Sequence, residues 1–332
     1  MAVQEAEKFG EDSRLATCLG GLAAMYHAQG KFEKAEPLYL RALAIDEKVL
    51  GLNHIDVATD LNNLAELYRT QGRFDKALPL YKRSLAIEEK ALGPEHAELA
   101  PTLSNLALLY LDRGKYADAE PLFKRALNIK EKTLSVDNPS IAATLKGLAA
   151  VNRALGKYDD AEPLLNRALT IDEKAYGQNH PEVGTDFNEL GVLFQAEKKY
   201  AEAAQAYERA VSLKERAYGP DHPDIAAGLN NLATVFVLQE KYDEAEPRFK
   251  RALAILEKKF GPNHPNAAKT LYYLADLYSR QGKYTEAEPL LKRAIAIGEG
   301  TPGIDEQELA AYREKYDEVS RKMTEKKAEP LE

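Results

Sequence analysis

The chain has little of what disulfide-rich, metal-binding or membrane proteins need. Cys18 is the single cysteine among 332 residues. An intramolecular disulfide is therefore impossible, and a cysteine-rich metal site is excluded. No apolar run approaches the roughly 20 residues that cross a bilayer, and the first residues, MAVQEAEKFGEDS, lack the apolar core of a signal peptide. We expect a cytoplasmic protein without a membrane partner, and an exported form whose leader has been removed fits the same residues.

Basic charge and catalytic motifs are also scarce. The net charge is −8, with 45 lysines and arginines against 53 acidic residues. Binding to a phosphate backbone requires clustered cations, so we expect no nucleic-acid partner. There is no P-loop, no G-x-G-x-x-G, no H-E-x-x-H and no G-x-S-x-G. The sequence therefore predicts a protein that is not an enzyme and that holds no cofactor or metal.

What the chain does have is a repeat with a period of 42 residues. An alanine recurs at this interval, an arginine follows it six positions later, and a glutamate follows six positions after that. The alanines are Ala35, Ala77, Ala119, Ala161, Ala203, Ala245 and Ala287; the arginines are Arg41, Arg83, Arg125, Arg167, Arg209, Arg251 and Arg293; the glutamates are Glu47, Glu89, Glu131, Glu173, Glu215, Glu257 and Glu299. Seven copies in register predict a repeat array. A ladder of charges that is present in every copy favours a structural role over a local site: the charges either tie one repeat to the next or are simply solvated.

Each repeat predicts two helices. In the second copy, Leu61, Leu64 and Tyr68 recur at helical spacing before a turn at Gly72, and a second apolar stripe follows. Glycine suits the left-handed conformation of such a turn. The fifth and sixth repeats place Lys198 and Glu240 there, so those two turns should be strained or shaped differently.

A nonamer such as YGPDHPDIA, residues 218–226, separates the helix pairs. We expect Gly219 to end one helix and Asp221 to cap the next, with Asp224 completing a capping box. A histidine recurs in this loop, at His54, His96, His180, His222 and His264. A metal or proton-relay ladder is one interpretation. Stacked helices lie roughly 10 Å apart, whereas zinc–nitrogen bonds are near 2 Å, so a structural role is favoured.

The pattern predicts an all-α fold with a defined order of parts. Residues 1–11 are expected to end a preceding helix or form an N-terminal cap. Seven repeats follow over 12–300, at about 12–53, 54–95, 96–137, 138–179, 180–221, 222–263 and 264–300. A capping helix at 304–327 and a disordered tail at 328–332 complete the chain.

Leu64, Ala65, Tyr68, Gly72, Phe74, Ala77 and Tyr81 form a motif that resembles the tetratricopeptide repeat. The 42-residue length is similar to the repeats of kinesin light chains and of many bacterial arrays. The resemblance covers roughly residues 10–300 and implies a right-handed superhelical α-solenoid whose first helices line a concave groove. The heptad segment through which kinesin light chains bind the motor chain is absent, so a motor-cargo function is not implied.

The resemblance also implies where a partner would bind. Members that clamp chaperone C-termini use lysine, asparagine and arginine at set first-helix positions. The matching positions here hold Asn62, Glu66, Asn105, Ala143 and Gly147, so such a clamp is disfavoured. The expected groove residues are instead the non-core positions of the first helices, which are rich in asparagine: Asn62, Asn63, Arg69, Asn105, Leu108, Arg153, Asn188, Gln195, Asn230, Asn231, Tyr272, Tyr273 and Arg280.

An asparagine amide both donates and accepts, which suits capture of an extended peptide. The alternative is that these amides bond neighbouring helices. The function that we expect is a non-enzymatic scaffold that binds a protein or peptide partner in the groove. A self-associating array, which would form a homo-oligomer, and a regulatory module acting with a separate enzyme or sensor chain are the alternatives.

Overall fold

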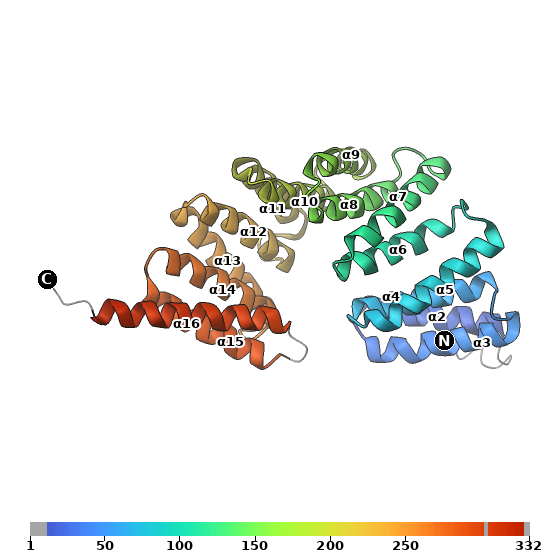
Figure 1. Ribbon diagram of the computed structural model, residues 1–332, viewed down its shortest axis with the longest axis horizontal. Coiled ribbons are helices and arrows are strands. Elements are labelled where there is room, and N and C mark those ends of the chain that lie inside the picture. The colour runs from blue at the N-terminus through green and yellow to red at the C-terminus, as the bar shows by residue number, and fades with distance from the viewer. Residues whose placement is uncertain (1–11, 302–304, 329–332) are drawn as a thin grey trace. The chain divides into compact units, whose positions relative to one another are not determined.

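The computed structural model describes residues 12–301 and 305–328, and within them the chain forms fifteen α-helices and no strand (Figure 1). The expectations for residues 1–11 and 329–332 lie outside the described residues. By its contacts the chain divides into two compact units, residues 1–171 and 172–332. The division falls inside α9.

The helices of unit 1 are α2 (Ser13–Ala28), α3 (Phe32–Leu50), α4 (Ile55–Thr70), α5 (Phe74–Leu92), α6 (Leu99–Asp112), α7 (Tyr116–Thr133), α8 (Pro139–Ala154) and the larger part of α9 (Tyr158–Tyr176). Those of unit 2 are α10 (Pro181–Ala196), α11 (Tyr200–Tyr218), α12 (Pro223–Leu238), α13 (Tyr242–Phe260), α14 (Pro265–Arg280), α15 (Tyr284–Glu299) and α16 (Glu306–Ala328). Even-numbered helices up to α14 are the first helices of the repeats, and odd-numbered helices are the second helices.

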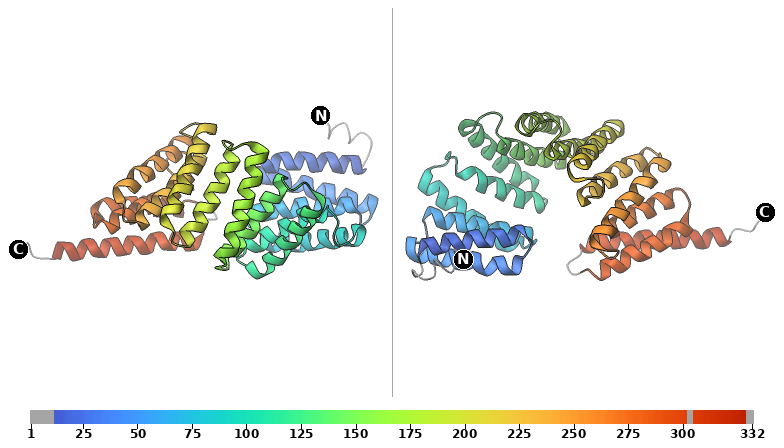
Figure 2. Two further views of the ribbon diagram at one scale, coloured as in Figure 1. Left: turned by 90° about the horizontal axis from the view of Figure 1, so that it is seen from above. Right: turned by 180° about the vertical axis from the view of Figure 1, so that it is seen from behind.

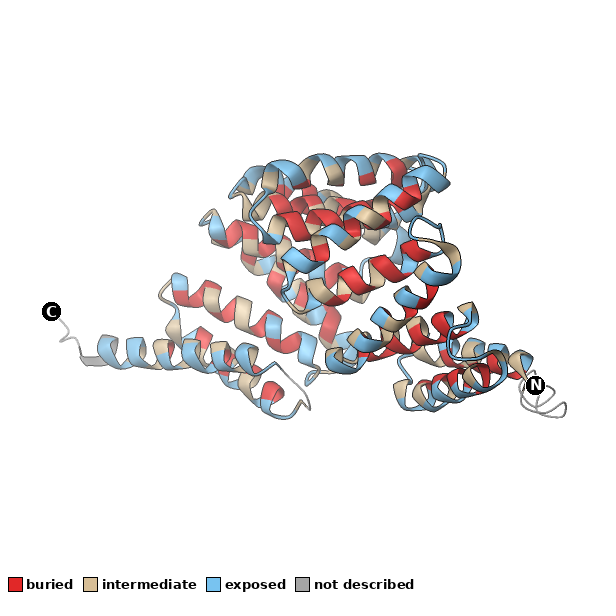
Figure 3. Cartoon of the chain, turned by 45° about the vertical axis from the view of Figure 1, so that its right-hand side comes forward, coloured by how far each residue is buried: buried red, intermediate tan, exposed pale blue. Residues whose placement is uncertain are grey.

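The recurring alanines are where the two helices of a hairpin meet. Ala77 on α5 and Ala245 on α13 are fully buried, and a large ring one turn further on, Tyr81 or Phe249, is buried with them. Buried residues accordingly follow the facing sides of the helices, while the opposite sides are exposed (Figure 3). A single hairpin cannot cover both of its apolar stripes, so adjacent hairpins must stack.

The turn inside each hairpin has one residue in the left-handed region. In the second repeat this is Gly72, with φ of 70°, and the backbone N–H of Arg73 donates to the carbonyl oxygen of Tyr68 at 2.8 Å. Lys198 and Glu240 occupy the same place with φ of 63° and 59°. Of the two outcomes expected from the sequence, the structure has the strained one, because the bulkier residues keep the left-handed conformation that glycine adopts at no cost.

The histidine of the nonamer loop is a helix cap. His222 is the N-cap of α12, and its Nδ1 accepts a hydrogen bond from the backbone N–H of Asp224 at 3.3 Å. Nδ1 of His54, His180 and His264 caps a helix in the same way, and the Asn138 side chain does so in the fourth repeat. His96 Nδ1 accepts from the N–H of Glu98, but Glu98 is itself the N-cap of α6 and has no side-chain cap bond. The expected cap at Asp221 is therefore wrong by one residue. Asp221 instead accepts from Lys258 Nζ at 2.5 Å.

In most repeats the arginine and glutamate ladders tie second helices together, which is one of the two structural roles expected from the sequence. Arg83 on α5 donates to Glu47 on α3 at 2.6 Å, and its other terminal nitrogen donates to the carbonyl oxygen of Leu52 at 3.0 Å. The pattern recurs 42 residues later, where Arg125 bonds Glu89 and the carbonyl oxygen of Pro94. In unit 2, Arg251 and Arg293 make the same pair of contacts. Each arginine thus joins one hairpin to the preceding loop.

Candidate functional site

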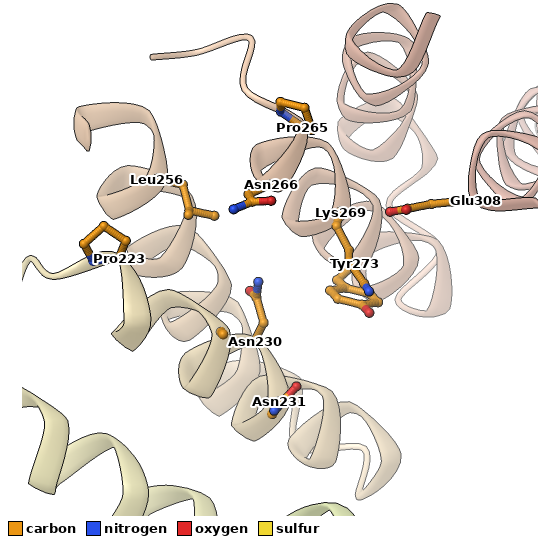
Figure 4. A pocket seen from close by; sticks show the side chains of 10 residues that line it. Pro223, Asn230, Asn231, Leu256, Pro265, Asn266, Lys269, Tyr273 and Glu308 are labelled. Atoms are coloured by element: carbon orange, nitrogen blue, oxygen red, sulfur yellow. The ribbon is translucent and has the colours of Figure 1, made fainter. Parts of the chain in front are cut away.

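The first helices of unit 2 contribute most of a cavity of about 420 Å³ (Figure 4). We call it the asparagine pocket and define it by its ten lining residues: Pro223, Ala227, Asn230 and Asn231 from α12, Leu256 from α13, Pro265, Asn266, Lys269 and Tyr273 from α14, and Glu308 from α16. The helices α12, α14 and α16 are neighbours in space, because α14 contacts both α12 and α16. The two views of Figure 2 show α16 running alongside the last hairpin.

The floor of the pocket is held by a short hydrogen-bond chain. Asn230 Nδ2 donates to Thr270 Oγ1 at 2.7 Å, and that hydroxyl donates to the carbonyl oxygen of Asn266 at 3.4 Å. Because the hydroxyl proton is used in this way, Thr270 must accept from Asn230, which fixes the orientation of the amide. Asn230 is only 9% exposed, and its Oδ1 is buried without a hydrogen-bond partner among the described residues. Asn230 is therefore held in one orientation, and most of its hydrogen-bonding groups face the protein interior.

Asn231 is more accessible than Asn230 and belongs to a pair. Its Nδ2 donates to Asn188 Oδ1 on α10 at 3.1 Å. Both side chains are partly exposed. Each amide uses one group in this bond, so Asn231 keeps its carbonyl oxygen and Asn188 keeps its N–H groups for another partner.

The two adjacent tyrosines of α14 have different surroundings. Tyr273 lines the pocket and lies 5.9 Å, between ring centroids, from Phe249. Tyr272 packs against Tyr312 of α16, with centroids 5.2 Å apart, and its burial raises the pKa of its hydroxyl above the usual value. Only Tyr273 of the two therefore offers a ring face to the pocket.

Two charged side chains lie at the edge of the pocket. Lys269 is exposed, and Glu308 reaches the pocket from α16 while it accepts a hydrogen bond from the Tyr312 hydroxyl. Burial, followed by this hydrogen bond, raises the pKa of Tyr312 above its ordinary value. The pocket thus combines amides, an apolar wall and one charge of each sign, which suits a polypeptide segment better than a strongly charged small molecule.

The first helices of unit 1 carry a similar amide pair. Asn105 Nδ2 donates to Asn62 Oδ1 at 3.2 Å, and both side chains are partly exposed. Asn63 and Arg153 are also partly exposed on α4 and α8. Leu108 packs at the margin of the core around Phe123.

Two arginine candidates and one glutamine are occupied by intramolecular bonds. Arg69 donates to Glu66 at 2.7 Å and to Asp112 at 2.6 Å, and the Glu66 hydrogen bonds raise the pKa of its guanidinium above the ordinary value. Arg280 donates to Asp276 at 2.7 Å. Gln195 accepts from the Tyr207 hydroxyl at 3.1 Å. These three side chains are held in place, and a partner would have to compete with those bonds.

Of the thirteen candidates from the sequence, the structure brings Asn230, Asn231 and Tyr273 into one pocket. The other lining residues were not among the candidates. Lys269 and Asn266 could have been found, because they lie about one and two turns before Tyr273 on the same helix. Glu308 carried no such signal, because its position depends on how α16 folds back on α14. Among the described residues no group of three or more His, Cys, Asp or Glu side chains could hold a metal ion. None of the described helices is long and apolar enough to span a membrane.

Comparison with known proteins places this geometry in a family. A sequence model described as tetratricopeptide repeat matches residues 2–48, 14–90, 56–132, 140–216, 187–258 and 224–299. A crystal structure of kinesin light chain nearly identical repeats from Podosopora anserina is 27% identical, with a TM-score of 0.54, over 63% of this chain and 99% of that one.

Two further structures share the fold. BtubC from P. vanneervenii is 24% identical, with a TM-score of 0.58, over 70% of this chain and 93% of that one. A Rap protein complexed with Competence and Sporulation Factor is 14% identical, with a TM-score of 0.55, over 94% of this chain and 99% of that one. No curated protein matches the sequence significantly. With its 42-residue helix hairpins, its capped loops and a repeat model that matches most of its length, the chain belongs to the tetratricopeptide repeat family, with repeats of the kinesin-light-chain type.

Proposed function

We propose that this protein is a non-catalytic interaction module that holds an extended segment of a partner protein against its first helices. Tetratricopeptide repeat proteins generally mediate protein–protein interactions. The observation that carries the proposal is the asparagine pocket, a cavity of about 420 Å³ to which neighbouring first helices contribute amide, aromatic and aliphatic side chains. In this arrangement the second helices and their arginine ladder are scaffold, and the first helices are the binding surface.

The amide pairs supply the main-chain recognition. An extended peptide presents alternating N–H and C=O groups, and it binds well to a surface that can both donate and accept. Asn188 with Asn231, and Asn62 with Asn105, each leave one amide oxygen and several N–H groups unused by the bond between them. Such groups accept a backbone of any sequence, so the pairs favour affinity without selecting side chains.

The pocket supplies the side-chain anchor. Leu256, Ala227 and the ring of Tyr273 form its apolar wall, and Asn266 and Lys269 lie at its edge. Binding energy in protein interfaces concentrates where one side chain of the partner fills such a pocket. A Rap protein with the same fold is solved in complex with Competence and Sporulation Factor, and we extend the idea of a bound partner to this chain as part of the proposal.

The test is a capture experiment with immobilised full-length chain and a cell extract, followed by identification of bound proteins. We expect specific partners whose capture falls at least tenfold with Asn231→Ala or Tyr273→Ala. Gln205→Ala is the matched control, because Gln205 is exposed on the second helix α11, and it should capture as the unmodified chain does.

Melting temperatures separate binding from folding. Asn63→Ala and Asn105→Ala extend the same test to unit 1. If the pocket variants melt at a lower temperature and still capture the same partners, the asparagines are structural and the proposed site is wrong. If no partner is retained at a level above that of a blank matrix, the proposed function itself is wrong.

A further inference from the structure

Two carboxyl groups meet inside the interface between the first and second hairpins. Asp46 lies on α3 and Asp60 on α4, and they are only 4% and 8% exposed. The two side chains are hydrogen-bond partners of each other, and Asp46 Oδ1 and Asp60 Oδ2, both buried, accept from no other donor among the described residues. Carboxylate oxygens only accept, so a hydrogen bond between two of them requires that one carboxyl keep its proton.

Helix α2 covers the pair from the other side. A Cβ built on Gly20 would lie 3.9 Å from Asp60 Oδ1, and the Ser13 hydroxyl stands beside Asp46. The α2–α3 hairpin thus closes over the carboxyl groups. If this hairpin moved away from α4, both carboxyl groups would reach water.

The groups around Asp46 and Asp60 favour the form of the pair in which one carboxyl group keeps its proton. From α4, Asp56 adds negative charge, and His54 Nδ1, which accepts from the Asp56 N–H, lies 3.5 Å from the Asp56 carboxylate. From α3, Glu47 adds negative charge, which Arg83 of α5 partly neutralises at 2.6 Å. Burial raises the pKa of Asp60 to about 7, and burial also raises the pKa of Asp46.

The next two hairpin interfaces of unit 1 have other residue types at the two equivalent positions. Forty-two residues on, Glu88 accepts a hydrogen bond from the Thr102 hydroxyl at 2.8 Å, and in the following copy Lys130 donates to Thr144 at 2.7 Å. There a single ionisable group faces a hydroxyl. Among these three interfaces, the first alone opposes two acids.

We propose that a single proton, shared by Asp46 and Asp60, holds the α2–α3 hairpin on α4, so that the hairpin docks firmly in mild acid and loosens as the pH rises to neutral. The docked state binds the proton more tightly than the undocked state, in which the aspartates have their ordinary acidity. The stabilisation is therefore complete below about pH 4 and is lost as the pH rises to about 7. Undocking also separates α2 from α4 at the hydrogen bond of 2.8 Å between His27 and Thr70. The proton thus controls whether α2 lies beside α4 and continues the row of first helices in unit 1.

Hydrogen exchange of the full chain between pH 5 and pH 9 measures the docking. After correction for the intrinsic exchange rate, the opening constant of α2 and α3 should rise by about tenfold to a hundredfold between pH 5 and pH 8 and change little above that. Asp46→Asn and Asp60→Asn should flatten this dependence, because an amide needs no titrating proton to donate. Glu33→Gln is the matched control, since Glu33 is an exposed acid on the same hairpin, and it should keep the pH dependence of the unmodified chain.

Two results would overturn the proposal. One is exchange of α2 and α3 that does not change with pH in the unmodified chain, and the other is an unchanged pH dependence in Asp60→Asn. If the aspartate variants do not fold, infrared spectroscopy decides the question. In a Glu88→Gln background at pH 5.5 to 6, the carbonyl stretch of a protonated carboxylic acid should be present and should disappear by pH 9. Absence of this band would exclude the shared proton.

Discussion

At the scale of single residues, the loop histidine is a hydrogen-bond acceptor. His222 caps a helix through Nδ1, as do His54, His180 and His264, and Asn138 caps the helix of the fourth repeat. A capping side chain satisfies one of the N–H groups that a helix start leaves unpaired. This accounts for the recurrence of the histidine without metal or proton chemistry.

We expect His222→Ala to lower the free energy of unfolding by about 1 kcal/mol, because the α12 cap is lost. His222→Asn should stay within about 0.5 kcal/mol of the unmodified chain, since asparagine is a strong capping residue. Urea denaturation followed by circular dichroism measures both variants, with Asn138→His as the reciprocal control. Equal losses for alanine and asparagine would show that the histidine ring contributes through something other than its cap.

Glu88 offers a second residue-scale prediction, at the interface between the second and third hairpins. It is 6% exposed, and burial raises its pKa to about 7. Because the folded state binds the Glu88 proton more tightly than the unfolded state, this proton stabilises the fold fully below pH 4.5. The stabilisation is lost as the pH rises to 7. Glu88→Gln should therefore be more stable than the unmodified chain at pH 8, by about 1 to 2 kcal/mol, and the difference should vanish by pH 4.5. Denaturation curves at the two pH values check the sign, and a loss of stability at pH 8 would contradict it.

At the scale of helices and turns, two hairpins carry backbone strain that five others avoid. Lys198 and Glu240 adopt positive φ where Gly30, Gly72, Gly114, Gly156 and Gly282 stand in the remaining repeats. Lys198→Gly and Glu240→Gly should each raise the free energy of unfolding by about 1 kcal/mol, because glycine adopts this conformation without a Cβ clash. Gly72→Ala should lower it by a similar amount. Thermal and urea denaturation measure the three variants, and no gain for either glycine would mean that the strain is relieved elsewhere in the turn.

Close helix packing yields a further prediction. A Cβ at Gly147 on α8 would lie 2.6 Å from the ring of Phe123 on α7, which is itself buried. Gly147→Ala should therefore cost about 1 to 3 kcal/mol through overpacking, even though alanine is the better helix former. Gly21→Ala is the matched control, because a Cβ there meets nothing within 4 Å, and it should be neutral or stabilising. Equal effects of the two substitutions in a denaturation experiment would mean that the Phe123 ring moves aside.

At the scale of the whole molecule, stability is local because each hairpin contacts only its neighbours. Tyr312 and Val319 of α16 are buried on the last hairpin, so α16 closes the C-terminal core of unit 2. Tyr312→Ala should cost about 3 kcal/mol in that region. Hydrogen exchange should then accelerate in α14 and α15 and stay unchanged in α4 to α7. A uniform acceleration over both units would show instead that the chain unfolds as one cooperative body.

The repeat pattern alone determined most of the fold. Periodicity of apolar residues and glycine at turns are local signals, so the sequence predicted paired helices, a period of 42 residues and a structural role for the arginine and glutamate ladders. The sequence also predicted that the histidines are structural. It placed the cap one residue early, because Asp221 and His222 are both capable caps. In the structure the aspartate bonds Lys258, which is distant in sequence, and the histidine caps the helix.

Only the tertiary structure decided which first-helix residues share a pocket and which interfaces bury charge. Asn230 and Asn231 are adjacent in the sequence, and the packing of α14 turns one inward to Thr270 while the other stays half-exposed. Likewise, Asp46 and Asp60 look like ordinary helix aspartates in the sequence, and only the packing of α3 against α4 buries them together. A repeat pattern records what every copy shares, whereas a site arises where one copy differs, and the effect of that difference depends on the neighbouring helices that cover it.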